Sequence, residues 1–121
     1  TPNLKEAEYA LGKLLKNDID VEKAGMEICN DLSLDACLIT RGPNGMSYIG
    51  NDAKFHISSE AKEIYDVGGA GDTVIASFAI GTFAGFDSET VTQFANKAAG
   101  IVVGHIGTTA ITIPELKEVS N

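Results

Sequence analysis

A glycine-rich, acidic stretch stands directly before a long apolar run. It reads DVGGAGDTVIA, from Asp66 to Ala76, and contains three glycines and two aspartates. Glycine loses more conformational freedom on folding than other residues, so such a cluster indicates a tight turn or a close approach of the backbone to a ligand. If the apolar run is a helix, the amides of Gly69, Ala70 and Gly71 lie at its N-terminus, where free N–H groups and the helix dipole favour an anion. Asp72 then places a carboxylate beside that anion site.

A purely structural interpretation of this stretch has about equal weight on spacing alone, because short glycine motifs often match by chance. The glycines can allow a helix to pack closely on a strand, and Asp72 can cap the helix start. The stretch has neither the GxxxxGK[ST] pattern of a Walker A loop nor a complete GxGxxG pattern. A dinucleotide-dependent oxidoreductase also needs an acidic residue after a second strand, whereas the sequence after Gly71 predicts helices.

Helices and strands alternate in the first half of the chain. Apolar residues at helical spacing predict a helix over residues 3–15, with Asn3 as candidate N-cap, and a second helix that starts at Asp18 or Asp20 and ends near residue 32. RGPNG (Arg41–Gly45) predicts a turn. Short apolar runs predict strands over residues 35–40, 46–50, 54–57 and 63–67.

The second half predicts two long helices. Residues 73–85 are apolar almost all round, which predicts a buried helix. A further helix follows, with Asp87 or Ser88 as N-cap and Gly104 or Gly107 at its end, before a short strand and a final helical turn. This alternation predicts an α/β fold with a sheet covered on both faces, in which strand-to-helix loops such as DVGGAGD gather at one edge.

Composition excludes several classes of protein. The 121 residues are 44% apolar and 21% charged, which is typical of one globular domain. The net charge of −8 disfavours a sequence-independent nucleic-acid binder. No apolar run is long enough to cross a bilayer, and the first residues lack a signal-peptide pattern. Cys29 and Cys37 form no CxxC pair, so we expect reduced core cysteines and a cytoplasmic protein.

Four segments, in order, resemble the ribokinase-like (PfkB) carbohydrate kinases. DVGGAGDT resembles their C-terminal signature, PNLKE carries their N-x-x-E motif, LITRGPNG resembles their strand and G-x-x-G turn, and FANKAAGIVVGHIGT resembles their late helix and loop. Within the family, TPNLKE, YDVGGAGDTVIA and AAGIVVGHIGT look most like the kinases of D-glycero-β-D-manno-heptose 7-phosphate. Gly68 replaces the usual threonine of the signature, which removes a hydroxyl and frees the backbone of the loop.

The resemblance implies ATP-dependent phosphorylation of a sugar hydroxyl and assigns roles to the matching residues. Asp72 would be the catalytic base, and the amides of residues 69–71 an anion hole for the transferring group. Asn3 and Glu6 would organise Mg²⁺, chiefly through its outer shell. The matching nucleotide-binding positions are Thr40, Gly42, Gly45, Asn96 and Gly107.

Plainer explanations stay open for these residues. Asn3 and Glu6 can be a helix cap and a surface acid, residues 40–45 a hairpin turn, and Asn96 a polar residue on a helix face. Three other polar side chains, Arg41, His56 and His105, are expected to be solvated or structural, although Arg41 is within reach of a phosphate. Asp66 is expected to support its loop rather than to lie near the phosphates or a monovalent cation.

The resemblance covers only the C-terminal half of such kinases. Residues 1–121 are therefore expected to be the nucleotide-binding portion of a three-layer α/β/α sandwich, with the N-terminal half and the lid outside. Expected partners are ATP with Mg²⁺, a sugar phosphate, a second copy and a fused nucleotidyltransferase domain, but not nucleic acid or membrane. The alternatives are a kinase of another sugar and a non-catalytic nucleotide-binding module, and Asp72 disfavours the latter. Alone, this portion is expected to be inactive and to self-associate through an uncovered sheet edge.

Overall fold

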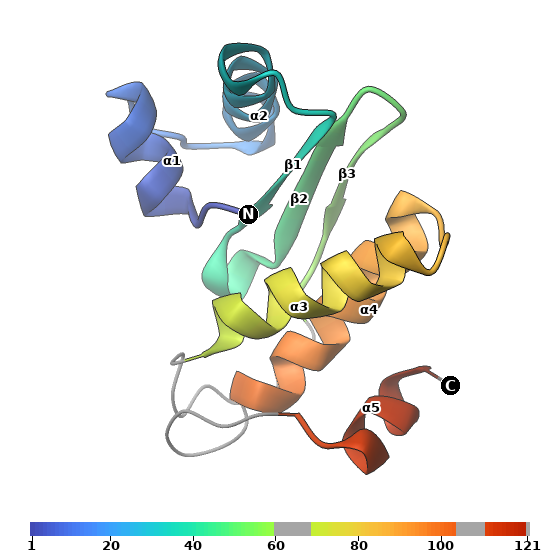
Figure 1. Cartoon of the computed structure of the whole chain (residues 1–121). Coiled ribbons are helices and arrows are strands. Elements are labelled where there is room, and N and C mark those ends of the chain that lie inside the picture. Colours follow the sequence, from blue (N-terminus) through green and yellow to red (C-terminus); the bar gives the residue numbers. More distant parts are fainter. Residues whose placement is uncertain (60–68, 104–110, 121) are drawn as a thin grey trace. The chain divides into compact units, whose positions relative to one another are not determined.

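The structure is a computed structural model that describes residues 1–59, 69–103 and 111–120 (Figure 1). The chain forms two compact units, Thr1–Ser58 and Ser59–Asn121, and each is described by itself. The strand predicted over residues 63–67 lies outside the described residues. None of the described helices is both long and apolar enough to span a bilayer.

The first unit is a sheet with two helices on one face (Figure 1). Strands β1 (Ala36–Thr40), β2 (Met46–Gly50) and β3 (Lys54–Ile57) lie at the predicted residues to within one position and form an antiparallel sheet in the order β1-β2-β3. Helices α1 (Leu4–Leu11) and α2 (Asp18–Leu32) cover it. Their shared core contains Ala7, Leu15, Val21, Ala24, Cys37, Ile39 and Ile49.

The chain start lies beside β1. Asn3 forms an isolated parallel bridge with Thr40, and the Thr40 N–H donates to the Pro2 carbonyl at 3.0 Å. The Arg41–Gly45 turn then connects β1 to β2 through a short 3₁₀ helix, η1 (Gly42–Asn44). Pro2 and Asn3, which directly precede α1, are therefore fixed beside the last residue of β1, just before this turn.

The second unit is helical in its described part. Helices α3 (Ala70–Phe83) and α4 (Ser88–Val103) pack against each other, and α5 (Ile113–Ser120) follows. Small residues allow close contact, since a Cβ added at Gly81 would lie 3.0 Å from both methyl carbons of Val91. Asp87 caps α4, because its carboxylate accepts hydrogen bonds from the Thr90 N–H at 2.9 Å and the Thr90 hydroxyl at 2.7 Å.

Helix α2 begins at Asp18, one of the two predicted starts, and Asn17 is its N-cap, with a side chain that accepts from the Asp20 N–H at 2.9 Å. Two sequence predictions about these helices are wrong. Helix α3 is not buried all round: α4 covers one side of it, while Ile80 and Phe83 on the other side are 68% and 96% exposed. The final helix α5 has eight residues instead of a single turn, and the predicted end of α4 lies outside the described residues.

Candidate functional site

The glycine-rich stretch opens α3, as predicted. Gly69 is the N-cap, with a left-handed backbone at φ 82°, and its carbonyl accepts from the Thr73 N–H at 3.0 Å and the Thr73 hydroxyl at 3.1 Å. Among the residues that the structure describes, no side chain caps this helix start. The amides of Ala70 and Gly71 therefore belong to an open first turn, at the positive end of the helix dipole.

Asp72 is exposed and occupies the third position of α3. The N-cap position belongs to Gly69, so the structure does not give Asp72 the capping role that the plain interpretation assigned to it. A Cβ added at the neighbouring Gly71 would meet no atom within 4 Å. The carboxylate and the glycine amides thus share one accessible helix end, with space around Gly71 for a ligand.

The Arg41–Gly45 turn is shaped by two glycines with different constraints. Gly42 has φ 56° and open space around it, whereas Gly45 has φ 84° and is buried against β3. A Cβ at Gly45 would lie 1.8 Å from the Ile57 carbonyl oxygen. Close backbone packing therefore accounts for glycine at position 45 without a ligand, while Gly42 is free to face one.

Asn3 and Glu6 form a reciprocal capping box at the start of α1. The Glu6 N–H donates to Asn3 Oδ1, and the Asn3 N–H donates to Glu6 Oε2, each at 2.8 Å. Both residues are exposed, and the Asn3–Thr40 bridge brings them beside the end of β1. The described residues contain no cluster of three or more His, Cys, Asp or Glu that could enclose a metal.

This donor set fits Mg²⁺ held mainly through water. Carboxylate and amide oxygens are the ligands that Mg²⁺ prefers, and Mg²⁺ usually keeps several waters. The box uses one oxygen of Glu6, and a carboxylate has further lone pairs to accept from a metal-bound water. Capping and metal organisation are thus compatible at these two residues.

Asn96 is buried in α4, at 4% exposure, between the buried residues Ala95 and Ala98. It is not a solvated polar residue on a helix face. Gly107, His105 and Asp66 lie outside the described residues. The predicted nucleotide-binding residues are divided between the two units, and each unit is described by itself. The nucleotide site that would combine them is therefore treated below as a proposal.

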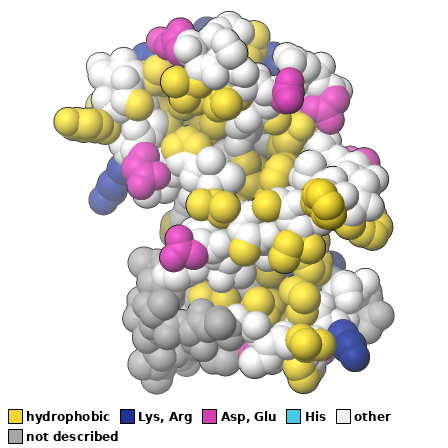
Figure 2. Space-filling model, in the orientation of Figure 1, with side chains coloured by type: hydrophobic (Ala, Val, Ile, Leu, Met, Phe, Trp, Pro, Cys, Tyr) yellow, Lys and Arg dark blue, Asp and Glu magenta, His cyan; other side chains and the backbone are white. Residues whose placement is uncertain are grey.

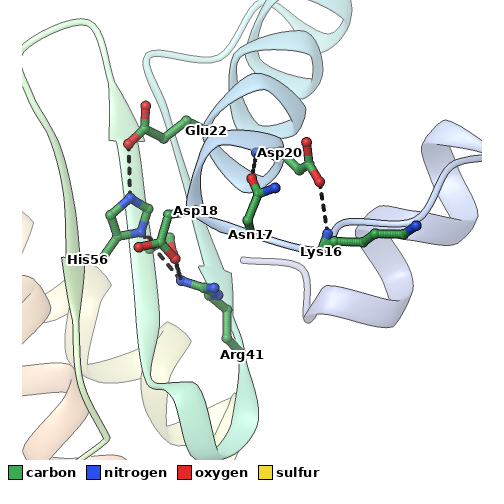
Figure 3. A network of polar contacts seen from close by, with 8 residues as sticks. Lys16, Asn17, Asp18, Asp20, Glu22, Arg41 and His56 are labelled. Carbon is green, nitrogen blue, oxygen red and sulfur yellow. Dashed lines mark hydrogen bonds and ion pairs between the residues drawn. The ribbon is translucent and has the colours of Figure 1, made fainter.

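Sequence reasoning missed a polar array around Arg41 (Figure 3). The Arg41 side chain is only 12% exposed, and its Nη1 donates to Asp18 Oδ1 at 2.7 Å and to Ser47 Oγ at 3.2 Å. His56 lies between Ser47 Oγ at 2.7 Å and Glu22 Oε1 at 2.9 Å. Arg41 is therefore not a solvated side chain. The one available signal was the predicted hairpin over residues 46–57, which pairs Ser47 with His56.

The pKa shifts in this unit follow from these contacts and from burial. The hydrogen bond from Arg41, helped by the nearby positive charges of His56 and Arg41, lowers the pKa of Asp18. Burial raises the pKa of Cys37 to about 11, and burial together with the charge of Asp35 raises that of Cys29. Both cysteines are free thiols with little thiolate at neutral pH, as structural cysteines have.

The sequence of this chain is similar to those of known carbohydrate kinases. The profile of the pfkB family of carbohydrate kinases matches residues 1–116. The bifunctional protein HldE of Haemophilus ducreyi is 45% identical over 118 residues, and that of Pseudomonas putida is 44% identical over 119. Each match covers 97% of this chain and 25% of the relative, so the chain spans about a quarter of the length of these proteins.

Solved structures show the same fold. Arabidopsis thaliana ribokinase, solved with ribose and ATP, is 27% identical, with a TM-score of 0.82 over 98% of this chain and 38% of the ribokinase. Escherichia coli phosphofructokinase-2, at 20% identity and a TM-score of 0.86 over 98% of this chain and 38% of that enzyme, supports the fold alone. The fold is thus that of the ribokinase-like α/β kinases, as predicted. The chain belongs to the pfkB family of carbohydrate kinases.

Proposed function

We propose that this chain supplies the nucleotide-binding portion of an ATP-dependent sugar kinase whose acceptor is the 1-hydroxyl of D-glycero-β-D-manno-heptose 7-phosphate. The observation that carries the proposal is the start of α3, where Asp72 follows Gly69, Ala70 and Gly71 and no described side chain caps the helix. The heptose acceptor is inferred from similarity to the HldE proteins, and the activity belongs to the protein at its natural length.

In this proposal Asp72 accepts the proton of the sugar hydroxyl as that oxygen attacks the γ-phosphorus of ATP. The new oxygen–phosphorus bond forms while the bond from the γ-phosphorus to the bridging oxygen breaks, and ADP leaves. The amides of residues 69–71 stabilise the charge on the transferring phosphoryl group. Glycine matters here because it lets a phosphate oxygen approach the backbone.

The remaining predicted residues complete the nucleotide site. Thr40 and Gly42 would border the phosphates and ribose, with Gly45 fixing the turn, and Asn96 and Gly107 would lie near the adenine. Mg²⁺, organised through water by Asn3 and Glu6, would neutralise phosphate charge when bound. A monovalent cation and a second copy of the chain stay predictions from the family resemblance. The relatives are named bifunctional, which supports a fused second domain, and its nucleotidyltransferase activity stays a prediction from the family resemblance.

The decisive experiment replaces Asp72 by Asn in the protein at its natural length. Asn keeps the shape but cannot accept the proton, so kcat should fall by about 10²–10⁴-fold. The dissociation constant of ATP and the melting temperature should change little, because Gly69 and not Asp72 is the N-cap. A panel of sugar phosphates tests the acceptor, and the heptose 7-phosphate should give the highest kcat/KM.

A matched control neutralises another acid in a first helical turn of the same unit. Glu89→Gln changes the exposed acid in the first turn of α4 and should leave kcat unchanged. Unchanged turnover in Asp72→Asn would remove Asp72 from the mechanism and leave a nucleotide-binding module without a catalytic base.

A further inference from the structure

Five side chains from three elements and a turn form one continuous hydrogen-bonded array in the first unit (Figure 3). Asp18 and Glu22 come from α2, Arg41 from the turn after β1, Ser47 from β2 and His56 from β3. The order of the shortest contacts is Asp18, Arg41, Ser47, His56, Glu22, and Arg41 Nη1 also lies 3.5 Å from His56 Nδ1. The chain of contacts therefore links the Arg41–Gly45 turn to α2 by two routes, one direct and one across the sheet.

Donor chemistry gives this array a direction. Arg41 can only donate, so Ser47 Oγ accepts from Arg41 Nη1. Glu22 lies 2.9 Å from His56 Nε2, which places the imidazole proton on Nε2. His56 Nδ1 then accepts a hydrogen bond from the Ser47 hydroxyl, with 2.7 Å between Oγ and Nδ1. Each of these contacts has one donor and one acceptor, so the array is internally consistent.

The carboxylate–imidazole–hydroxyl order is also that of a nucleophile triad, but the surroundings rule out that role. Ser47 has no exposed surface, and its oxygen already accepts from a guanidinium. A nucleophile needs access to its substrate. The hydroxyl of Ser47 instead connects two other side chains.

Stability alone does not explain the array. Arg41 Nε is buried and has no hydrogen-bond partner among the described residues. A buried donor without a partner costs free energy, so an apolar side chain at this position would be a simpler solution for stability. Holding the guanidinium here therefore costs free energy of folding, which indicates that its placement serves a function.

The backbone of Arg41 is hydrogen-bonded within the turn, and Ser47 and His56 lie beside it. The Arg41 N–H donates to the Gly45 carbonyl at 2.8 Å, and the Asn44 N–H donates to the Arg41 carbonyl at 3.1 Å. Ser47 stands two residues after Gly45, and His56 precedes Ile57, whose carbonyl lies against Gly45. Every array member except those on α2 is thus within two residues of a contact that shapes the turn.

We propose that Glu22, Ser47 and His56 are positioning residues that hold Arg41, and through it the Arg41–Gly45 turn, in the shape that binds the nucleotide. The inference rests on the proposed function in one respect, namely that this turn borders the ATP phosphates. It adds three residues that touch neither ATP nor sugar and act only through the turn.

The test compares Glu22→Ala and Ser47→Ala with Glu27→Ala, in the protein at its natural length. Glu27 lies on the same helix and pairs with Lys13, so Glu27→Ala also removes one exposed ion pair of α2 but leaves the array intact. The KM for ATP should rise about two- to tenfold in the two array variants, the equivalent of one lost hydrogen bond. The KM for heptose 7-phosphate and kcat at saturating ATP should stay as in Glu27→Ala.

Hydrogen exchange supplies a second readout that needs no activity. The amides of Asn44 and Gly45, which are bonded within the turn, should exchange faster in Glu22→Ala and Ser47→Ala than in Glu27→Ala. Should Ser47→Ala fail to fold, His56→Asn takes its place, because its amide oxygen can still accept from Ser47 while the link to Glu22 is lost.

The outcomes separate the two proposals. Equal exchange of the turn amides in array and control variants overturns the positioning role, whatever the activity. A parallel loss in kcat and both KM values that follows the melting temperature also overturns it, since that is the signature of general destabilisation. A wild-type protein that neither binds ATP nor phosphorylates the heptose overturns the proposed function, and with it the nucleotide part of this inference.

Discussion

At the scale of single residues, the two glycines of the Arg41–Gly45 turn allow a sharp prediction. Alanine at either position must adopt a left-handed backbone, which is strained for any residue with a Cβ. In Gly45→Ala the new Cβ would also lie 1.8 Å from a backbone oxygen of β3, whereas in Gly42→Ala it would meet no atom within 4 Å. We expect Gly42→Ala to cost about 1 kcal/mol in the free energy of unfolding. Gly45→Ala should cost well over about 3 kcal/mol, because the β2–β3 contact must open.

Urea unfolding of both variants measures this difference. Equal costs for Gly42→Ala and Gly45→Ala would show that the close contact with Ile57 does not exist in solution. Since the backbone of β3 is the obstacle, no side-chain movement can relieve it.

The sequence predicted some residue roles and missed others for a physical reason. The capping box of Asn3 and Glu6 follows from a local pattern, since its partners are three residues apart. The contact of His56 with Glu22 joins residues 34 positions apart and depends on how α2 packs on the sheet. No local pattern encodes such packing, so the sequence indicated no partner for Arg41 or His56.

At the scale of elements, the N-cap of α4 carries a pH-dependent prediction. Hydrogen bonds from the backbone and side chain of Thr90 lower the pKa of Asp87 below 3.8. The unfolded state therefore binds more protons between the folded and unfolded pKa values, so the contribution of the cap is complete above the unfolded value and is lost as the pH falls through the folded one. Asp87→Ala should melt at a lower temperature than wild type at neutral pH, and the difference should vanish on acidification.

Asp87→Asn is the control for this titration. Asn caps a helix about as well as Asp but has no proton to gain, so its melting temperature should stay near that of wild type at neutral pH. Thermal unfolding followed by circular dichroism over a pH series measures all three proteins. A constant gap between wild type and Asp87→Ala down to strongly acidic pH would contradict the assignment.

The sequence predicted which segments form helices and strands, but not which neighbours cover each of them. Short apolar runs between turn residues gave the strands of the β1-β2-β3 sheet within one residue. The apolar run of α3 gave the helix but not its exposure, because hydrophobicity does not say which neighbour covers each side. The predicted start of α2 at Asp18 or Asp20 is confirmed at Asp18, and it was predicted only to within two residues because Asn17, Asp18 and Asp20 are all good capping types.

At the scale of the whole molecule, α3 presents an apolar surface that no described element of its own unit covers. Thr73, Val74, Ser77 and Gly81 are buried, whereas Ile75, Ala79, Ile80 and Phe83 are exposed. Hydrophobic side chains are visible along this helix in Figure 2. A contiguous apolar surface of this kind marks an interaction site or causes association. The chain spans about a quarter of its curated relatives, so it lacks most of the polypeptide that could provide a cover.

The 121-residue chain expressed alone should therefore self-associate and show no kinase activity. Replacing Ile80 and Phe83 together by Lys puts two charges on the exposed side of α3 and should shift sedimentation towards the monomer. Tyr9 and Leu14 are 92% and 70% exposed in the first unit, so the double change of these two to Lys adds the same charge elsewhere. If this control dissociates the assembly equally well, net charge rather than the α3 surface decides association. If the unchanged chain sediments as a monomer at every concentration, the apolar side of α3 is not adhesive in water, and its hydrophobicity needs another explanation.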